Sequence, residues 1–335
     1  MAESTMFLSN ISVVDHAYID DMGMIIGGSY NPSFLVTGKV TDDESVVIDF
    51  STGKKALKKI IDHDVYGFDH KLWLIEGFSN VSTVTIVSSA KREYLNKQFL
   101  AISDPRLKQY MEESEKTMSM RSDVVRITSR AFEIDVPRDA IKWVQNLKPS
   151  KDLQEIVTEA LVALLEEKLQ AEADYEVSLE CKLEVTEHVY NQHVPTAPFR
   201  YTHGLKFSTS WGCQNIAHGH LSYMQLIFDD MTKTIRPEYV NAVAKEFENV
   251  VFVFKENVIA HDEKHITIQY RTNRGHFRAK YNLKRFDVRL LDTETTVEYL
   301  VDHISKCDAV QSLLKEGLKE LYVSEGLSKG AMKRF

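Results

Sequence analysis

The sequence predicts an α+β fold in which one arrangement of strands and helices occurs twice. Runs with an apolar residue at every second position, such as Met224, Leu226 and Phe228, are typical of half-buried strands. Residues 153–165 instead carry apolar side chains at helical spacing. Residues 191–198, NQHVPTAP, have the composition of a linker, and after them the order of strands and helices begins again. This recurrence predicts an internal duplication.

In the first half, residues 7–20 and 24–40 predict two strands, and Ser51 is the expected cap of a following helix. A second helix over 153–165 and a strand over 175–191 complete this half. Residues 88–122 are charged and match no element of the repeated order, so we expect an insertion there.

In the second half, residues 199–229 predict two strands, and a helix starts at Pro237. Further strands are expected in residues 250–281, followed by a helix over 295–304 and a terminal strand over 319–327. We therefore place one module in residues 1–192 and the other in residues 198–335.

Composition limits the class of protein. A chain of 335 residues, 43% hydrophobic and 27% charged, can bury a sizeable core. A net charge of −8 argues against a general nucleic-acid binder, because such binding needs clustered cations. The three cysteines have unrelated spacings, which favours a reducing compartment. We found neither a signal peptide nor a membrane-spanning run, so we expect a cytoplasmic protein without a membrane partner.

One basic segment, residues 271–285, interrupts this acidic background. Its alternation predicts a hairpin strand whose charges face solvent. The alternative is capture of an anion.

Residues 199–229 carry the densest set of chemically active side chains: His203, Cys213, His218 and His220. Residues two apart in a strand share a face, so His218 and His220 can point to one place. A third imidazole would complete a three-histidine zinc site with one open position, as catalytic zinc requires. Cys213 is close enough to act as nucleophile or acid/base. A His-x-His pair alone also occurs as surface or core histidines.

This stretch resembles the start of the 6-pyruvoyltetrahydropterin synthase family, which includes the 6-carboxytetrahydropterin synthases of the queuosine pathway. In that family a strand ends in a zinc histidine, a loop carries a catalytic cysteine, and His-Gly-His opens the next strand. Here those positions are His203, Cys213 and His218-Gly219-His220. The resemblance implies tandem tunnelling-fold (T-fold) modules, each a four-stranded antiparallel sheet with two helices on one face. It also implies closure of such sheets into a barrel in a homo-oligomer.

The first half resembles the same family at residues 47–50, VIDF, and at residues 68–72, FDHKL. The resemblance implies a catalytic pair of Asp69 and His70, in which the carboxylate orients the imidazole for proton transfer. The alternative is a helix C-terminus that His70 merely complements. At the His-Gly-His positions the first half has Ile26 and Gly28, so we expect it to bind no metal, with His16 as a relic of the first ligand.

The resemblance further implies that Thr296, in a late-helix motif, and Glu325 bind the pterin, with Glu187 at the corresponding place in the first half. The second half has no Asp-His pair after its first helix; it contains only His261-Asp262, in which the two residues occur in the opposite order. We therefore expect a composite site between a first and a second module, within one chain or across chains.

The implied activity is that of a zinc-dependent carbon–oxygen lyase acting on the small molecule 7,8-dihydroneopterin triphosphate. Elimination of triphosphate would give 6-pyruvoyltetrahydropterin or, after side-chain cleavage, 6-carboxytetrahydropterin. Arg271, Arg274 and Arg278 are available to receive the triphosphate. The alternatives are a non-catalytic pterin- or purine-binding T-fold protein, a GTP cyclohydrolase, and a nitrile reductase.

Overall fold

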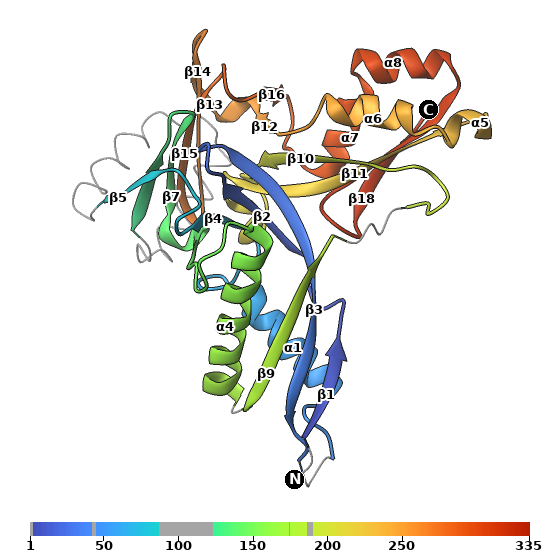
Figure 1. The fold of residues 1–335 in the computed structure, drawn as a ribbon. Coiled ribbons are helices and arrows are strands. Elements are labelled where there is room, and N and C mark those ends of the chain that lie inside the picture. The colour runs from blue at the N-terminus through green and yellow to red at the C-terminus, as the bar shows by residue number, and fades with distance from the viewer. Residues whose placement is uncertain (1–2, 42–44, 87–122, 174, 186–189) are drawn as a thin grey trace.

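The structure is a computed structural model that describes residues 3–41, 45–86, 123–173, 175–185 and 190–335. Its architecture is mixed α/β, with three six-stranded sheets and helices on the outside of two of them (Figure 1). The expected insertion over residues 88–122 and Glu187 both lie outside the described residues.

The first sheet contains strands of the first half in the order β1-β3-β2-β4-β8, and β9 also pairs with β3. The long strand β3 extends into the lower part of the molecule, where two helices lie beside it (Figure 1). The helix α1 is capped by Asp49 rather than Ser51, because Asp49 Oδ1 accepts the Thr52 N–H at 2.9 Å. The elements are β1 Glu3–Leu8, β2 Val14–Ile19, β3 Ile25–Lys39, α1 Phe50–Ile61, β4 Lys71–Ile75, β8 Ile141–Val144, α4 Leu153–Ala173 and β9 Val177–Glu184.

The second sheet contains strands of the second half in the order β16-β12-β10-β11-β17-β18. Its apolar core includes side chains of α6, α7 and α8, which lie together at the upper right of Figure 1. The elements are β10 Ala197–His203, β11 His218–Phe228, α5 Met231–Thr234, α6 Pro237–Lys245, β12 Val250–Phe254, β16 Val288–Leu291, α7 Val297–Ser305, α8 Asp308–Lys315, β17 Leu318–Ser324 and β18 Gly330–Arg334.

The third sheet joins the two halves. Three strands come from each half, and β7 pairs antiparallel with β15 where the halves meet. Its apolar side chains form one core with residues of the other two sheets. The strands are β5 Ser82–Ile86, β6 Val124–Thr128, β7 Phe132–Pro137, β13 Val258–His261, β14 His265–Thr272 and β15 Gly275–Asn282.

These sheets differ from the expected four-stranded antiparallel sheets. Within the first sheet, β4 runs parallel to both β2 and β8, and within the second, β12 runs parallel to both β10 and β16. The strands between β4 and β8, and between β12 and β16, leave their own sheet and form the third one. Sequence alternation shows strands but carries no information about which distant strand each will pair with.

The two halves repeat one pattern of pairing. An antiparallel hairpin, β2–β3 or β10–β11, is followed by two parallel additions beside its first strand, and a late strand pairs with its second strand. The two hairpins cross with their backbones in contact at Gly27 and Gly219. A Cβ built on Gly27 would lie 2.2 Å from the Tyr201 carbonyl oxygen, so only glycine permits this crossing.

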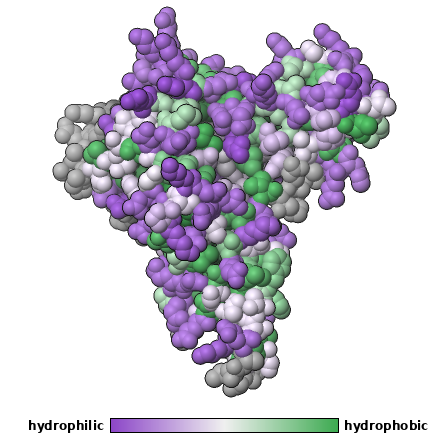
Figure 2. Space-filling view, viewed as in Figure 1, coloured by the Kyte–Doolittle hydropathy of each residue, from purple (hydrophilic) through white to green (hydrophobic). Residues whose placement is uncertain are grey.

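The surface in the view of Figure 2 is largely hydrophilic, with hydrophobic residues gathered along the lower part where β3 and β9 run. Among the described helices, none combines the length and the apolar character that a membrane crossing requires.

Candidate functional site

Three buried imidazoles meet where β10 ends and β11 begins. His203 pairs in register with His218, and His220 lies two residues further along the same strand face. Each side chain is about 1% exposed. One ligand nitrogen from each ring lies within 4.8 Å of the others, and the Nε2 atoms of His203 and His220 are 3.0 Å apart. The three rings therefore converge on one point.

The outer nitrogens of these rings are held by oxygen acceptors. His203 Nδ1 lies 2.8 Å from the Thr295 carbonyl oxygen, and His218 Nδ1 lies 3.0 Å from that of Asn215. A carbonyl can only accept, so each Nδ1 carries the proton and each Nε2 keeps its lone pair. Burial holds the pKa of His203 and of His218 well below the ordinary value, which keeps both rings neutral.

This donor set fits zinc. Neutral imidazoles with oriented Nδ1–H groups are the usual ligands of catalytic zinc. His203 and His218 each have a carbonyl acceptor for Nδ1, and His220 Nδ1 lies 3.2 Å from the Asp15 carboxylate. Tetrahedral bonds of the usual zinc–nitrogen length would place two ligand nitrogens about 3.3 Å apart. The 3.0 Å between the Nε2 atoms of His203 and His220 is close to that separation.

A second group of side chains adjoins the imidazoles. Asp69 and His70 stand at the start of β4, not at the end of the preceding helix, and Asp69 Oδ2 lies 2.5 Å from His70 Nδ1. His70 also lies beside Cys213, which is in the short turn Gly212–Gln214. Ligand atoms of His70, Cys213 and His218 lie within 4.8 Å of one another. Asp69, His70 and Cys213 therefore form a row that ends beside the imidazole cluster.

The electrostatics favour a charged pair within this row. Burial by itself raises the pKa of the Cys213 thiol, but the hydrogen bond and charge of His70 hold that pKa below its ordinary value. Burial likewise disfavours the His70 imidazolium, yet Asp69 and Cys213 together raise the pKa of His70 well above its ordinary value. Both shifts favour a thiolate beside an imidazolium, with the Asp69 carboxylate behind the imidazolium.

The loop that carries Cys213 is fixed by contacts from the first half. A Cβ on Gly212 would lie 2.5 Å from His70 Cβ, so glycine is required for the close approach of His70. The Asn215 side chain donates to the carbonyl oxygens of His70 at 3.3 Å and of Ala140 at 3.1 Å. Residues of both halves therefore lie side by side here within one chain.

The two residues expected to bind the pterin, Glu325 and Thr296, differ from each other in their surroundings. The Glu325 carboxylate follows β17, is 21% exposed, and acts on the pKa of Cys213 through its charge. Thr296 is the cap residue before α7, and its carbonyl oxygen accepts the Leu300 N–H at 2.8 Å. The preceding residue, Thr295, is the one that touches His203.

Three further residues of the site, Asp15, Thr295 and Asn215, were not predicted from the sequence. Asp15 on β2 is 1% exposed, and its Oδ1 lies 3.2 Å from His220 Nδ1. Burial alone would raise the pKa of Asp15, but His220 and Lys329 hold it well below the ordinary value. The sequence did not predict the roles of Thr295 and Asn215 either. The backbone carbonyl oxygen of Thr295 contacts His203 and that of Asn215 contacts His218, and no side-chain pattern encodes such contacts.

The first half presents other side chains at the places of the three histidines. In the second half, strand register pairs His203 with His218 and Tyr201 with His220. The corresponding pairs of the first half are Tyr18 with Ile26 and His16 with Gly28. Ile26 and Gly28 thus stand at the two histidine positions, as expected. His16 is no relic of the first ligand, because Tyr18 holds that position. The His16 ring instead stacks on Trp73 at 3.6 Å between centroids.

The second half likewise lacks an Asp-His pair at the place of Asp69 and His70. Asp69 Oδ1 accepts the Asp15 N–H at 2.9 Å, and Glu248 Oε2 accepts the Arg200 N–H at 2.8 Å. The next residues, His70 and Asn249, both have positive φ, 53° and 60°. Glu248 and Asn249 are therefore the counterparts, whereas His261 and Asp262 are exposed at the edge of the third sheet.

The basic hairpin faces solvent only in part: Lys284 and Arg285 are exposed, as expected, but other cations of the segment are not. Arg271 and Arg274 are buried, at 8% and 3% exposure, and Arg274 donates to the carbonyl oxygens of Trp211 and Gly212. Arg278 pairs with Glu133 at 2.6 Å. The Arg274 guanidinium thus holds the cysteine loop, and Arg278 lies within the third sheet.

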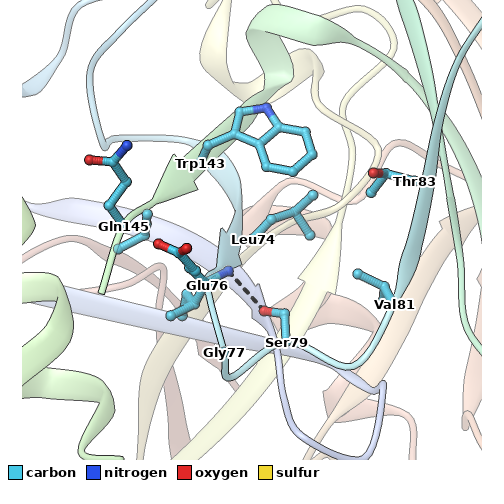
Figure 3. A pocket seen from close by; sticks show the side chains of 10 residues that line it. Leu74, Glu76, Gly77, Ser79, Val81, Thr83, Trp143 and Gln145 are labelled. Carbon is cyan, nitrogen blue, oxygen red and sulfur yellow. Dashed lines mark hydrogen bonds between the residues drawn. The ribbon is translucent and has the colours of Figure 1, made fainter. Parts of the chain in front are cut away.

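A separate pocket of about 430 Å³ lies at the ends of β4 and β8 (Figure 3). Leu74, Val81 and Trp143 supply apolar walls, and Ser79 Oγ accepts the Ile75 N–H at 2.9 Å. Its lining contains neither histidine nor cysteine, so the chemistry of the imidazole cluster has no counterpart here.

Comparisons with known proteins give little beyond this geometry. No family model matches the chain, and no curated protein matches it. Among solved structures, 6-pyruvoyltetrahydropterin synthase from Plasmodium vivax is similar at 16% identity and a TM-score of 0.34, covering 56% of this chain and 95% of that one. A catalytic-residue mutant of the same enzyme matches at 16% identity and a TM-score of 0.33, covering 55% and 92%. Values this low assign no activity, so the functional argument rests on the site itself.

Proposed function

We propose that this protein is a zinc-dependent pterin synthase that acts on 7,8-dihydroneopterin triphosphate and eliminates triphosphate. The observation that carries the proposal is the row of Asp69, His70 and Cys213 ending beside His218 of the imidazole cluster. The residues resemble those of the 6-pyruvoyltetrahydropterin synthase family, and this resemblance supplies the substrate class. The product is 6-pyruvoyltetrahydropterin or, where the side chain is also cleaved, 6-carboxytetrahydropterin.

The metal of the proposal is held by His203, His218 and His220, whose ligand nitrogens converge on one point. When bound, zinc supplies Lewis acidity that lowers the pKa of a coordinated side-chain hydroxyl and stabilises the developing negative charge.

The proton transfers are assigned to the charged row. The Cys213 thiolate removes a proton from the substrate side chain, and the His70 imidazolium donates one. Asp69 holds the His70 ring through Nδ1 and keeps it protonated, because its carboxylate raises the pKa of His70. The raised pKa of His70 and the lowered pKa of Cys213 both favour this pairing of acid and base.

Substrate orientation is assigned to Glu325 and Thr296. A carboxylate such as Glu325 can accept two parallel hydrogen bonds from the pterin amino and ring N–H groups. Lys329 Nζ lies 3.6 Å from Glu325 and 3.1 Å from Asp15, which supports a position of Glu325 at the rim of the same site.

The proposal extends to the organisation of the chain. The repeated pairing pattern supports two diverged T-fold modules, residues 1–192 and 198–335, and the site of the first is metal-free. Among the described residues, nothing pairs with the outer edges of the first two sheets, which supports barrel closure in a homo-oligomer. Three free cysteines support a cytoplasmic location. Native mass spectrometry tests the oligomer: a monomer at micromolar concentration would contradict it.

The function is tested by incubating the zinc-loaded protein with 7,8-dihydroneopterin triphosphate and identifying products by mass spectrometry. The Cys213→Ala variant should keep its zinc and lose activity about 10²–10⁴-fold, the usual contribution of a proton-transfer group. A wild-type protein that holds zinc but leaves the substrate unchanged would contradict the proposal. Release of formate from GTP would instead indicate a cyclohydrolase.

A further inference from the structure

Asp15 is a first-half residue whose side chain faces the second half. Its carboxylate is buried on β2, with Oδ1 3.2 Å from His220 Nδ1. The Ser29 hydroxyl donates to the same oxygen at 2.5 Å. On the other side, Lys329 Nζ lies 3.1 Å from Oδ2. The carboxylate therefore has a partner for each oxygen, as a buried charge requires.

The backbone of Asp15 touches the other part of the site. Its N–H donates to Asp69 Oδ1 at 2.9 Å, and its carbonyl oxygen accepts the His70 N–H at 2.6 Å. Asp15 is thus bonded to the Asp69–His70 pair through its backbone and lies against the imidazole cluster through its side chain.

The surroundings are shaped around this carboxylate. Gly326, in the turn after β17, has a φ of +64°, and a Cβ there would lie 2.2 Å from Asp15 Oδ1. The Ser222 hydroxyl oxygen accepts the Gly326 N–H at 3.2 Å and so holds this turn against β11. Lys329 also lies 3.6 Å from Glu325, which links the carboxylate to the rim of the site.

We propose that Asp15 is a positioning residue that fixes the His220 ring with Nε2 toward His203 and His218, and so sets the metal affinity of the second half from the first. A metal-binding imidazole is commonly oriented by a carboxylate on its other nitrogen. This inference rests on the proposed zinc site, but it concerns a residue that the proposed reaction does not use.

The test is the zinc affinity of the full chain, measured by competition with a chromophoric chelator. Asp15→Asn keeps the shape of the side chain and removes its charge, so the zinc Kd should rise about 10–100-fold. The visible spectrum of the cobalt-loaded protein should change as well, because the ring of one ligand is no longer held. Asp262→Asn is the matched control: this exposed carboxylate lies 3.9 Å from His265 and away from the cluster, so both readouts should stay unchanged.

The outcomes separate this inference from the proposed function. A wild-type chain that binds no zinc would contradict the zinc site itself. Wild type and Asp15→Asn binding zinc equally well, with the same cobalt spectrum, would overturn the positioning role. If Asp15→Asn does not fold, Ser29→Ala decides: it removes the hydroxyl that holds Oδ1, and the zinc Kd should rise, though by less. An unchanged Kd in that variant would also overturn the inference.

Discussion

The β2–β3 hairpin of the first half and the β10–β11 hairpin of the second occupy equivalent places and present different side chains. Where the second has His203, His218 and His220, the first has Tyr18, Ile26 and Gly28. The hydrogen-bonding pattern of the strands is the same in both. Backbone pairing therefore does not determine whether three imidazoles converge; the residues on one strand face do.

Just before β4 and β12 the situation is reversed: here the first half carries the functional side chains and the second half lacks them. Asp69 and His70 adjoin the cysteine loop, whereas Glu248 and Asn249 hold the same backbone contacts without an imidazole. Each half keeps one part of the constellation and lacks the other. The complete arrangement exists because the two hairpins cross at Gly27 and Gly219.

The largest effect is expected from His218→Ala, which removes an imidazole shared by both groups of side chains. Two remaining histidines cannot complete a three-ligand zinc site, so bound zinc should fall from about one per chain to nearly none. Elemental analysis of the purified protein measures this. His261→Ala removes an exposed histidine of the third sheet and should leave zinc in place; equal zinc in all three proteins would contradict the assignment.

The crossing of the hairpins is tested by Gly27→Ala. The new Cβ would meet the Tyr201 carbonyl oxygen at 2.2 Å and the His220 backbone nitrogen at 2.8 Å, and backbone atoms cannot move aside alone. Overpacking of this kind should lower the free energy of unfolding by about 2–3 kcal/mol. Denaturant titration measures the loss.

A matched glycine in helix α1 sharpens this prediction. At Gly53 the nearest atom to a built Cβ is 3.5 Å away, which is an ordinary contact. Gly53→Ala should therefore raise the free energy of unfolding by about 0.5–1 kcal/mol, because alanine favours helix. If both variants shift stability alike, the close approach of the halves is not what constrains Gly27.

A smaller effect is expected from Asp69→Asn. The measured quantity is the rate at which iodoacetamide alkylates Cys213. Asp69 raises the pKa of His70, and the His70 charge lowers that of Cys213. A lowered thiol pKa means that wild-type thiolate persists as the pH falls below the ordinary cysteine value. In the variant the thiol reprotonates, and alkylation at pH 7 should slow about 10-fold.

Peptide mass spectrometry separates this signal from the other thiols. Burial raises the pKa of Cys181 to about 12 and also raises that of Cys307, so both should react slowly at pH 7. A Cys213 alkylation rate that is the same in both proteins across pH 5–9 would mean that the carboxylate does not support the ion pair.

Sequence reasoning reached the residues whose signal is local. The i, i+2 spacing of His218 and His220 determines that both lie on one strand face, and the flanking motif identified Asp69 and His70. The contacts that complete the site are distant in the chain: Asp15 meets His220, and Thr295 meets His203. No periodicity connects such residues, because the contact depends on how two hairpins cross.

Contacts between residues distant in sequence also explain why the exposure of segment 271–285 and the pairing of the strands were predicted incorrectly. The segment 271–285 alternates as a surface strand would, yet Arg274 is buried because carbonyl oxygens of the cysteine loop and of Asp139 accept its N–H groups. These acceptors come from residues far away in sequence. The third sheet likewise pairs β7 with β15, a partnership between halves that neither strand encodes alone.

The smallest effect is expected from Glu248→Gln, the counterpart of the change at Asp69. Glu248 accepts the Arg200 N–H and pairs with its guanidinium at 3.4 Å, but both side chains are partly exposed, at 35% and 40%, so solvent screens the pair. Unfolding should weaken by less than about 1 kcal/mol, and the glutamine oxygen can still accept the N–H. Zinc content and Cys213 alkylation should match wild type. A loss of either would mean that the second half contributes a proton-relay group at this position, and the division of chemistry between the halves would have to be redrawn.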